Sequence, residues 1–538
     1  MTARQPRESV GAACLAIGLC LAVWVTFRPL LDGGFFLDDL VRLYDLANYG
    51  LGKLLLSPYG GHLLLASNWV YAAFWRVFGL EPRWWFATVV ALHAANTVLL
   101  FGVLRRFGSG NLVAVAFAAL WGLCPVQAGA LGWMAVFGHV LLGTIVLVWL
   151  RDVAGVVAGR APVGGRRMAC WVVVGVLAAT SFAIGLPIAL ALPLAAPLLL
   201  GGVPNGRRVG VALCSLLILV PVLYLGQHAL YRRLFGIAPF STPVTMLRVD
   251  PAAVPGQLVE LTWYLLDFVT YAAGVLLLGA LGGSPGSGPG GTGVGADVQL
   301  ARLGIPAAIL LAAGVWGLWR APAMRRSHAL GLAGLGLAGY VAIAATAVLS
   351  GRTQGSMSLG LERGAVIATV AMLPRYHYVP TIFLTVLLAL AVEACAARTP
   401  QSRRAAWVLS AAVLAWLTVR VWWDRPMVLR LVTPSVFAHE LRRLDADVAG
   451  SPDPLRADLV NTPVGSGFLA LHDASFPGRA ALCVIAYPDG VVRDKTVRFI
   501  EHDPRLLAVV QAQTGTPIAR LVVPPLAVPP DAGVTPGR

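Results

Sequence analysis

The feature that most constrains the fold is a series of apolar stretches, each about 20 residues long, between residues 10 and 421. A helix of that length spans the hydrocarbon core of a bilayer. Of the 538 residues, 58% are hydrophobic and only 12% are charged, whereas soluble domains carry about 25% charged residues. The pattern excludes a soluble enzyme and predicts an all-α polytopic membrane protein with about 11–13 transmembrane helices.

The positive charges separate these stretches. The net charge is +16, with 41 Lys and Arg against 25 Asp and Glu, and the arginines form short clusters such as Arg105–Arg106, 151–167 and 320–326. Such clusters mark the cytoplasmic ends of membrane helices and require no nucleic-acid partner. We therefore expect a multi-pass plasma-membrane protein whose N-terminus is cytoplasmic and whose partner is the lipid bilayer.

The clusters also predict the topology. Residues 10–30 form an uncleaved signal anchor, and 31–84 form the first extracytoplasmic loop, with Trp69, Trp75, Trp84 and Trp85 at the membrane interface. Further spans are predicted at 85–104, 111–124, 137–150, 168–184, 186–201, 208–226, 329–349, 376–396 and 405–421.

Two segments need separate treatment. A single crossing at 257–281 would place the basic cluster 320–326 outside, so we expect a re-entrant or broken helix there and an exposed loop at 227–255. The chain then divides into a transmembrane domain, 1–423, and a small C-terminal extracytoplasmic α+β domain, 424–538, with β-type runs at 482–487 and 497–500.

The first outer loop contains adjacent carboxylates, Asp38 and Asp39, which lead into an amphipathic helix at 40–56. Acids at the N-terminus of a helix satisfy its free amides, which is a purely structural explanation. However, acids beside a membrane are costly unless they are solvated or functional. The two acids follow an apolar Phe35–Leu37 segment that would hold them at the bilayer surface, so they are the candidate catalytic residues.

The order of several motifs resembles that of the GT-C superfamily of integral-membrane glycosyltransferases, which includes protein O-mannosyltransferases and lipid A aminoarabinose transferases. Its hallmark is an acidic pair after the first span. The motifs with similar counterparts are Asp38-Asp39, Gly61-His62, Phe78–Pro82, Leu92–Asn96, Arg105-Arg106, Cys124–Trp133 and Arg375–Pro380. Many relatives have a Lys-Glu pair where this chain has Phe182–Gly185.

The resemblance implies an extracytoplasmic active site in a bacterial inner membrane. The enzyme would transfer a sugar from a polyprenyl-phosphate donor to an envelope lipid, glycan or protein. Asp38 would be the general base, Asp39 would orient it or bind the acceptor, and Arg375 with Tyr376 would bind the donor phosphate. The alternative for Arg375 is an interfacial anchor.

Three histidines and one acidic pair complete the candidates. His62 lies in the outer loop and is a candidate substrate ligand, while His93 lies within a span, where either substrate binding or hydrogen bonding to a neighbouring helix explains it. His139 is a weaker candidate. Glu260 and Asp267 lie on one helical face, which indicates contact with water or protein.

Cofactor motifs are scarce. The sequence has no zinc-type His/Cys cluster and no Walker phosphate loop, so no cofactor is assigned. A divalent metal at Asp38 and Asp39 stays open, because hard cations favour carboxylate oxygens.

Two other classes fit the composition. A secondary transporter or lipid-linked-sugar flippase would also be polytopic, but an inverted repeat is expected there and none is evident. A non-catalytic assembly protein whose C-terminal tail binds an envelope partner is the third class.

Overall fold

A computed structural model describes residues 6–35, 38–235, 253–278, 323–349, 363–423, the strands 456–461 and 496–501, and isolated positions at 303–319, 425–450 and 491. Its α-helices are α1 (Pro6–Phe27), α2 (Asp38–Leu56), α3 (Leu65–Phe78), α4 (Pro82–Arg106), α5 (Asn111–Gly122), α6 (Ala128–Leu131), α7 (Gly138–Val157), α8 (Gly165–Ala179), α9 (Gly185–Leu199), α10 (Gly206–Leu213), α11 (Leu216–Phe235), α12 (Val254–Leu278), α14 (Ala323–Leu349), α16 (Arg363–Ala371), α17 (Pro380–Ala396) and α18 (Pro400–Trp423). Short 3-10 turns include η1 (Arg28–Asp32), η2 (Tyr59–Gly61), η3 (Pro125–Gln127), η4 (Met134–Val136) and η7 (Pro374–His377).

The helices confirm a membrane architecture at a coarse level. Within the described residues, seven helices are long and apolar enough to cross a bilayer, or eight if the bent pair α5 and η3–α6 forms one span. Helices α9 and α17 are apolar but shorter. Every predicted span coincides with one of these helices or with α8, because each apolar stretch satisfies its backbone polar groups internally only as a helix.

Two predictions differ from the structure. Helix α12 is continuous across 257–278, so a broken helix there is wrong, and a re-entrant course stays a prediction; Pro255 and Gly256 stand in the first turn of α12, where a helix tolerates them. Helix α11 continues to Phe235, so 227–235 is helical and carries Arg232 and Arg233 in its last turn.

The tryptophans predicted at the membrane interface of the first outer loop differ in exposure. Trp69 and Trp84 are exposed, as interfacial anchors would be. Trp85 is fully buried, contrary to expectation, because its indole nitrogen donates to the Gly79 carbonyl at 3.1 Å and its ring packs edge-on against Tyr71. Trp85 therefore fixes the turn between α3 and α4.

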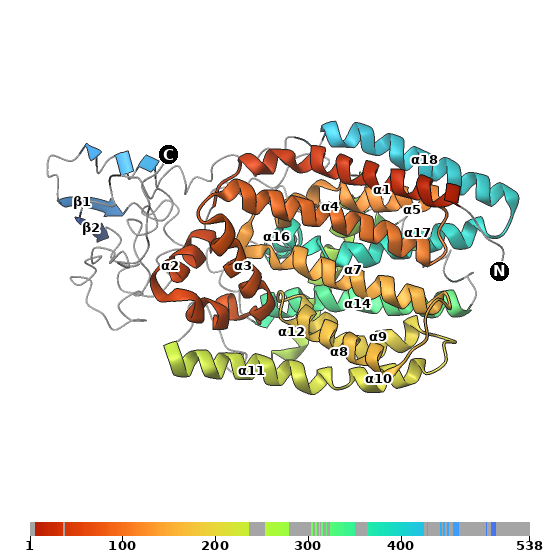
Figure 1. Cartoon of the computed structure of the whole chain (residues 1–538), viewed down its shortest axis with the longest axis horizontal. Helices are drawn as coiled ribbons and strands as arrows, with labels where there is room; N and C mark the ends of the chain where they lie inside the picture. Colours follow the sequence, from red (N-terminus) through yellow and green to blue (C-terminus); the bar gives the residue numbers. More distant parts are fainter. Residues whose placement is uncertain are drawn as a thin grey trace. The chain divides into compact units, whose positions relative to one another are not determined.

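The helices form a bundle in the unit that comprises residues 1–33 and 55–433. In it α4 packs against α1, α5 and α7, while α14 packs against α9 and α17 (Figure 1). Glycines allow close approach: a Cβ at Gly143 of α7 would lie 2.7 Å from the Tyr378 ring. Small residues at such contacts let membrane helices pack closely.

A buried hydrogen-bond network joins four segments at the centre of this bundle. The Tyr378 hydroxyl, which precedes α17, donates to His93 Nδ1 of α4 at 2.8 Å and accepts from Asn96 Nδ2 at 3.1 Å. The Gly122 carbonyl accepts from His93 Nε2 at 2.9 Å, because a carbonyl oxygen only accepts. Asn96 Nδ2 also donates to the Val140 carbonyl of α7 at 3.1 Å.

A buried cation terminates α12. Arg420 of α18 is 1% exposed, and its guanidinium donates to the carbonyls of Val275 and Leu276, each at 2.6 Å. Carbonyls in the last turn of a helix lack intrahelical partners and carry partial negative charge. Arg420 supplies both the donors and the charge, and so ties α18 to the end of α12.

The second unit comprises residues 34–54 and 434–538. Strands β1 (Arg456–Asn461) and β2 (Thr496–Glu501) pair in parallel, with Arg456 opposite Thr496. Strand β2 includes the predicted run 497–500, whereas β1 was not predicted and 482–487 lies outside the described residues. A complete C-terminal α+β domain stays a prediction.

Replacing Tyr378 by Phe should lower the stability of the bundle. The change removes two buried hydrogen bonds and leaves His93 Nδ1 and Asn96 Nδ2 each short of one, which costs about 2–4 kcal/mol. Thermal unfolding of the purified protein in detergent measures the loss. Tyr224→Phe is the matched control, because the part-buried Tyr224 hydroxyl donates to the Gly61 carbonyl. An equal effect of both variants would contradict a special role for the network.

Candidate functional site

The two candidate acids begin helix α2. Asp38 is part-exposed, whereas Asp39 is completely buried and so is Arg42, which is 3% exposed. Residues three or four apart in a helix lie on one face, so Arg42 neighbours both Asp38 and Asp39 along α2. The two acids differ in exposure: Asp38 is part-exposed, and Asp39 is buried.

The candidate residues belong to two units. Asp38 and Asp39 lie in the unit that contains residues 34–54, whereas His62, His93 and Arg375 lie in the unit that contains residues 55–433. In the unit of residues 1–33 and 55–433, two of the predicted ligands, His62 and Arg375, pack against a common set of aromatic rings.

Arg375 lies in η7, immediately before α17. Its guanidinium carbon is 4.9 Å from the centre of the Trp133 ring and 4.9 Å from the centre of the Tyr376 ring. In the described part of the chain, no carboxylate forms an ion pair with Arg375. A guanidinium held by ring faces keeps its hydrogen-bond donors directed elsewhere, which suits binding of an external anion.

His62 and His139 pack against one phenylalanine. The His62 ring lies 5.5 Å from the Phe182 ring, and the buried His139 ring lies 4.1 Å from it, centre to centre. Trp133 packs against the same apolar cluster, formed by Leu64, Val136 and Phe182. We call the set His62, Trp133, His139, Phe182 and Arg375 the basic aromatic cluster.

Local packing brings these segments together. Helix α7 starts at Gly138, where a Cβ would overlap the Ser181 carbonyl oxygen, so only glycine lets the start of α7 lie against the 181–182 turn. At Gly129 of α6 a Cβ would lie 2.9 Å from the Arg375 backbone nitrogen. These two glycines therefore set how closely α6 and α7 approach the residues of the basic aromatic cluster.

His377 anchors η7 on its other side. The His377 ring is completely buried; Nε2 donates to the Ala371 carbonyl at 2.7 Å and Nδ1 accepts from the Tyr340 hydroxyl at 2.9 Å. These two bonds require the tautomer of His377 with its proton on Nε2, and they fix the turn that carries Arg375.

His93 does not join the basic aromatic cluster. Both of its ring nitrogens bond to protein groups, Gly122 and Tyr378, and it is completely buried. The structure thus supports the interpretation of His93 as an interhelical hydrogen-bonding residue, and its assignment to substrate binding finds no support in these contacts.

Sequence reasoning missed Phe182 and undervalued His139. In the sequence, Phe182 stands out only as a departure from the Lys-Glu pair of the GT-C relatives, yet its ring contacts the rings of His62 and His139. His139 stands at the N-terminal end of an apolar span, which marks an ionisable group as a functional candidate. The position of His139 in an apolar span is visible in the sequence, whereas its proximity to His62 and Arg375 is visible only in the structure.

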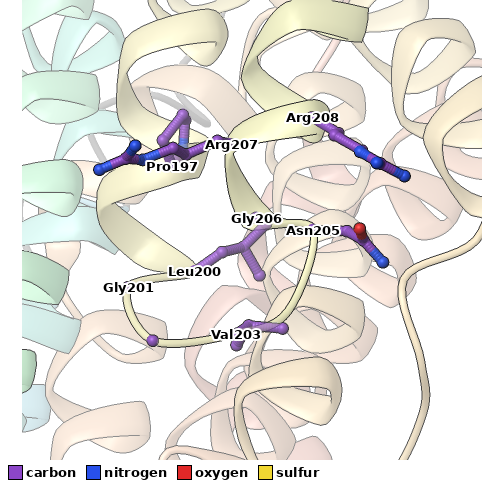
Figure 2. Close-up of a pocket in the computed structure, with 9 residues that line it drawn as sticks. Pro197, Leu200, Gly201, Val203, Asn205, Gly206, Arg207 and Arg208 are labelled. Carbon is purple, nitrogen blue, oxygen red and sulfur yellow. The ribbon is translucent and has the colours of Figure 1, made fainter.

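A pocket of about 540 Å³ lies elsewhere, in the turn between α9 and α10 (Figure 2). Its lining residues are Pro197, Leu200, Gly201, Gly202, Val203, Asn205, Gly206, Arg207 and Arg208. None of the predicted site residues lines it. Its exposed arginines belong to a cluster predicted at the cytoplasmic boundary, which explains them without a ligand.

Metal binding receives no support from the described residues, among which no three His, Cys, Asp or Glu side chains are grouped closely enough to hold an ion. Comparison of the chain with protein-family models and with curated proteins returns no match. The site must therefore be interpreted from its own chemistry.

Gly138→Ala should disturb the basic aromatic cluster. The added methyl group forces α7 away from the Ser181 carbonyl, which costs about 1–3 kcal/mol and is measured by thermal unfolding in detergent. Gly102→Ala is the control: this position in α4 has open space, so the variant should gain roughly 0.5–1 kcal/mol from helix propensity. Equal stability of the two variants would contradict the packing described for Gly138.

Proposed function

We propose that the protein is a membrane glycosyltransferase of the GT-C type, which transfers a hexosyl or pentosyl group from a polyprenyl-phosphate donor to an envelope lipid, glycan or protein. The observation that carries the proposal is the contact of two motif-bearing segments, those of His62 and Arg375, with one set of aromatic rings. A donor phosphate needs positive charge and hydrogen-bond donors; Arg375 carries the charge, and His62 offers a ring N–H donor.

The proposed reaction requires a base. Asp38 takes the proton of the acceptor hydroxyl or amide as that group attacks the anomeric carbon, and the bond from that carbon to the phosphate oxygen breaks with its electron pair on the phosphate. The partial exposure of Asp38 suits a residue that must reach the acceptor. The buried Asp39, on one face with Arg42, suits a positioning residue.

The same proposal includes the finer architecture. The shorter helices α5, α8, α9 and α17 complete a set of about eleven spans. The N-terminus lies in the cytoplasm of a bacterium, the acids and the basic aromatic cluster lie outside, and residues 424–538 form a small domain on the outer side. The lipid bilayer, the donor and the acceptor are the partners.

A flippase or transporter is the second candidate, because its helices would also enclose a cationic site for a lipid phosphate. The basic aromatic cluster alone fits both functions. The acidic pair separates them, since a flippase breaks no glycosidic bond and needs no general base.

Asp38→Asn should abolish sugar transfer and leave membrane insertion intact. The amide cannot take up the proton of the acceptor group, so we expect the rate of sugar transfer to fall at least about 100-fold. Mass spectrometry of envelope lipids, glycans and proteins from cells with each variant measures this loss. Asp32→Asn is the matched control, because Asp32 is an exposed acid of the same loop. Full transfer by the folded Asp38→Asn protein would eliminate Asp38 as the base.

Proteoliposomes test the second candidate. Movement of a lipid-linked sugar across the bilayer without an acceptor would favour the flippase, and its absence together with transfer to an added acceptor would favour the enzyme.

A further inference from the structure

His139 is a buried polar side chain with no hydrogen-bond partner in the described part of the chain. Its exposure is 0%, and neither Nδ1 nor Nε2 has a donor or acceptor within reach there. A buried polar group left unsatisfied costs about 1–3 kcal/mol. Among the described residues, the other completely buried histidines, His93 and His377, have both ring nitrogens bonded. His139 therefore differs from them in lacking a hydrogen-bond partner on either nitrogen.

The surroundings of His139 are basic. Arg375 and His62 both lie within electrostatic reach of its ring. The ring also belongs to the first turn of α7, a helix of 20 residues whose N-terminal amides attract negative charge. An arginine, an imidazole without a partner and a helix N-terminus together favour a bound anion.

We propose that His139 is a ligand of the donor phosphate, binding it together with Arg375 and His62; this inference rests on the proposed function. Arg375 and His62 are part-exposed and His139 is buried, so the first two form the entrance of the site and His139 its floor. In this proposal the side chains of Arg375 and His62 rotate to bind the phosphate, and their rotation opens a path from the phosphate to the buried His139 ring.

A phosphate group fits this arrangement better than water does. It offers several oxygens, so one group accepts from the planar guanidinium fork and from two imidazoles that approach from different elements. A single buried water would satisfy His139 but would leave the charge of Arg375 uncompensated in the aromatic cluster. The two occupants predict different results when His139 is replaced.

Binding of farnesyl phosphate, a short polyprenyl phosphate, tests the proposal on the purified full-length protein in nanodiscs. His139→Phe fills the same space without a donor, so the dissociation constant should rise about tenfold to a hundredfold, the effect of losing one hydrogen bond to a charged group. His139→Gln keeps a donor and should bind more tightly than His139→Phe. It also serves as the second variant if His139→Phe fails to fold.

His328→Phe is the matched control. His328 is 4% exposed and its Nε2 also lacks a partner among the described residues, but it lies in α14 beside Phe107 and not in the basic aromatic cluster. Its replacement should leave the dissociation constant unchanged. An equal loss in both variants would overturn the proposal, as would unchanged affinity of folded His139→Phe.

Two further probes identify the source of the phosphate. Farnesol has the chain without the anion and should bind more weakly than farnesyl phosphate; equal binding would overturn the proposal. Inorganic phosphate that competes poorly with farnesyl phosphate indicates a lipid-linked group, and competition at similar concentrations indicates a soluble phosphate at the same residues.

The proposed function can fail separately from this inference. If farnesyl phosphate binding depends on His139 while Asp38→Asn retains full sugar transfer, His139 binds phosphate and the glycosyltransferase mechanism is wrong. If Asp38→Asn loses transfer while His139→Phe binds normally, the mechanism stands and His139 is not a ligand.

Discussion

The hydroxyl of Tyr378 makes the interaction on which the rest of the bundle depends. Its two hydrogen bonds join the segment before α17 to His93 and Asn96 of α4, and those residues continue to α5 and α7. Inside a bilayer, polar groups find partners only within the protein. A network with one satisfied arrangement therefore specifies how four segments meet. Arg375 stands three residues before Tyr378, so the same bonds determine where that cation lies.

At the part-exposed Arg375, aromatic rings take the place that a carboxylate usually has beside an arginine. An ion pair would neutralise Arg375 and occupy its donors. Contacts with Trp133 and Tyr376 stabilise the cation through their ring faces and leave its charge available. Phe182 extends the same apolar wall to His62 and His139. In such apolar surroundings a cation attracts a negatively charged group more strongly than in water, which supports the proposed binding of a phosphate.

Sequence reasoning predicted the helices well because membrane helices obey a simple rule. Length and hydropathy located the apolar helices, since a helix alone satisfies the backbone of an apolar segment in lipid. The amphipathic pattern at 40–56 located α2. It failed at α12, where charge counting overrode a helix-compatible sequence, and at β1, where short polar segments carry little signal. Only part of the basic aromatic cluster was predicted from the sequence. Motif order indicated His62 and Arg375, whereas the contacts of His139 with Phe182 depend on packing between segments more than 40 residues apart.

The positive-inside rule explains the arginines at the predicted cytoplasmic ends of the helices. The arginines that it does not explain, Arg375 and Arg420, need another reason. In the predicted topology Arg375 lies outside, where an arginine contributes nothing to orientation. Arg420 is buried, but its guanidinium bonds to carbonyls in the last turn of α12, which gives it a structural reason. Arg375 has ring contacts and no such carbonyl bonds among the described residues. A cation that neither orients the chain nor ends a helix fits the proposed role of Arg375 as a phosphate ligand, and its contacts with Trp133 and Tyr376 also fit an interfacial anchor.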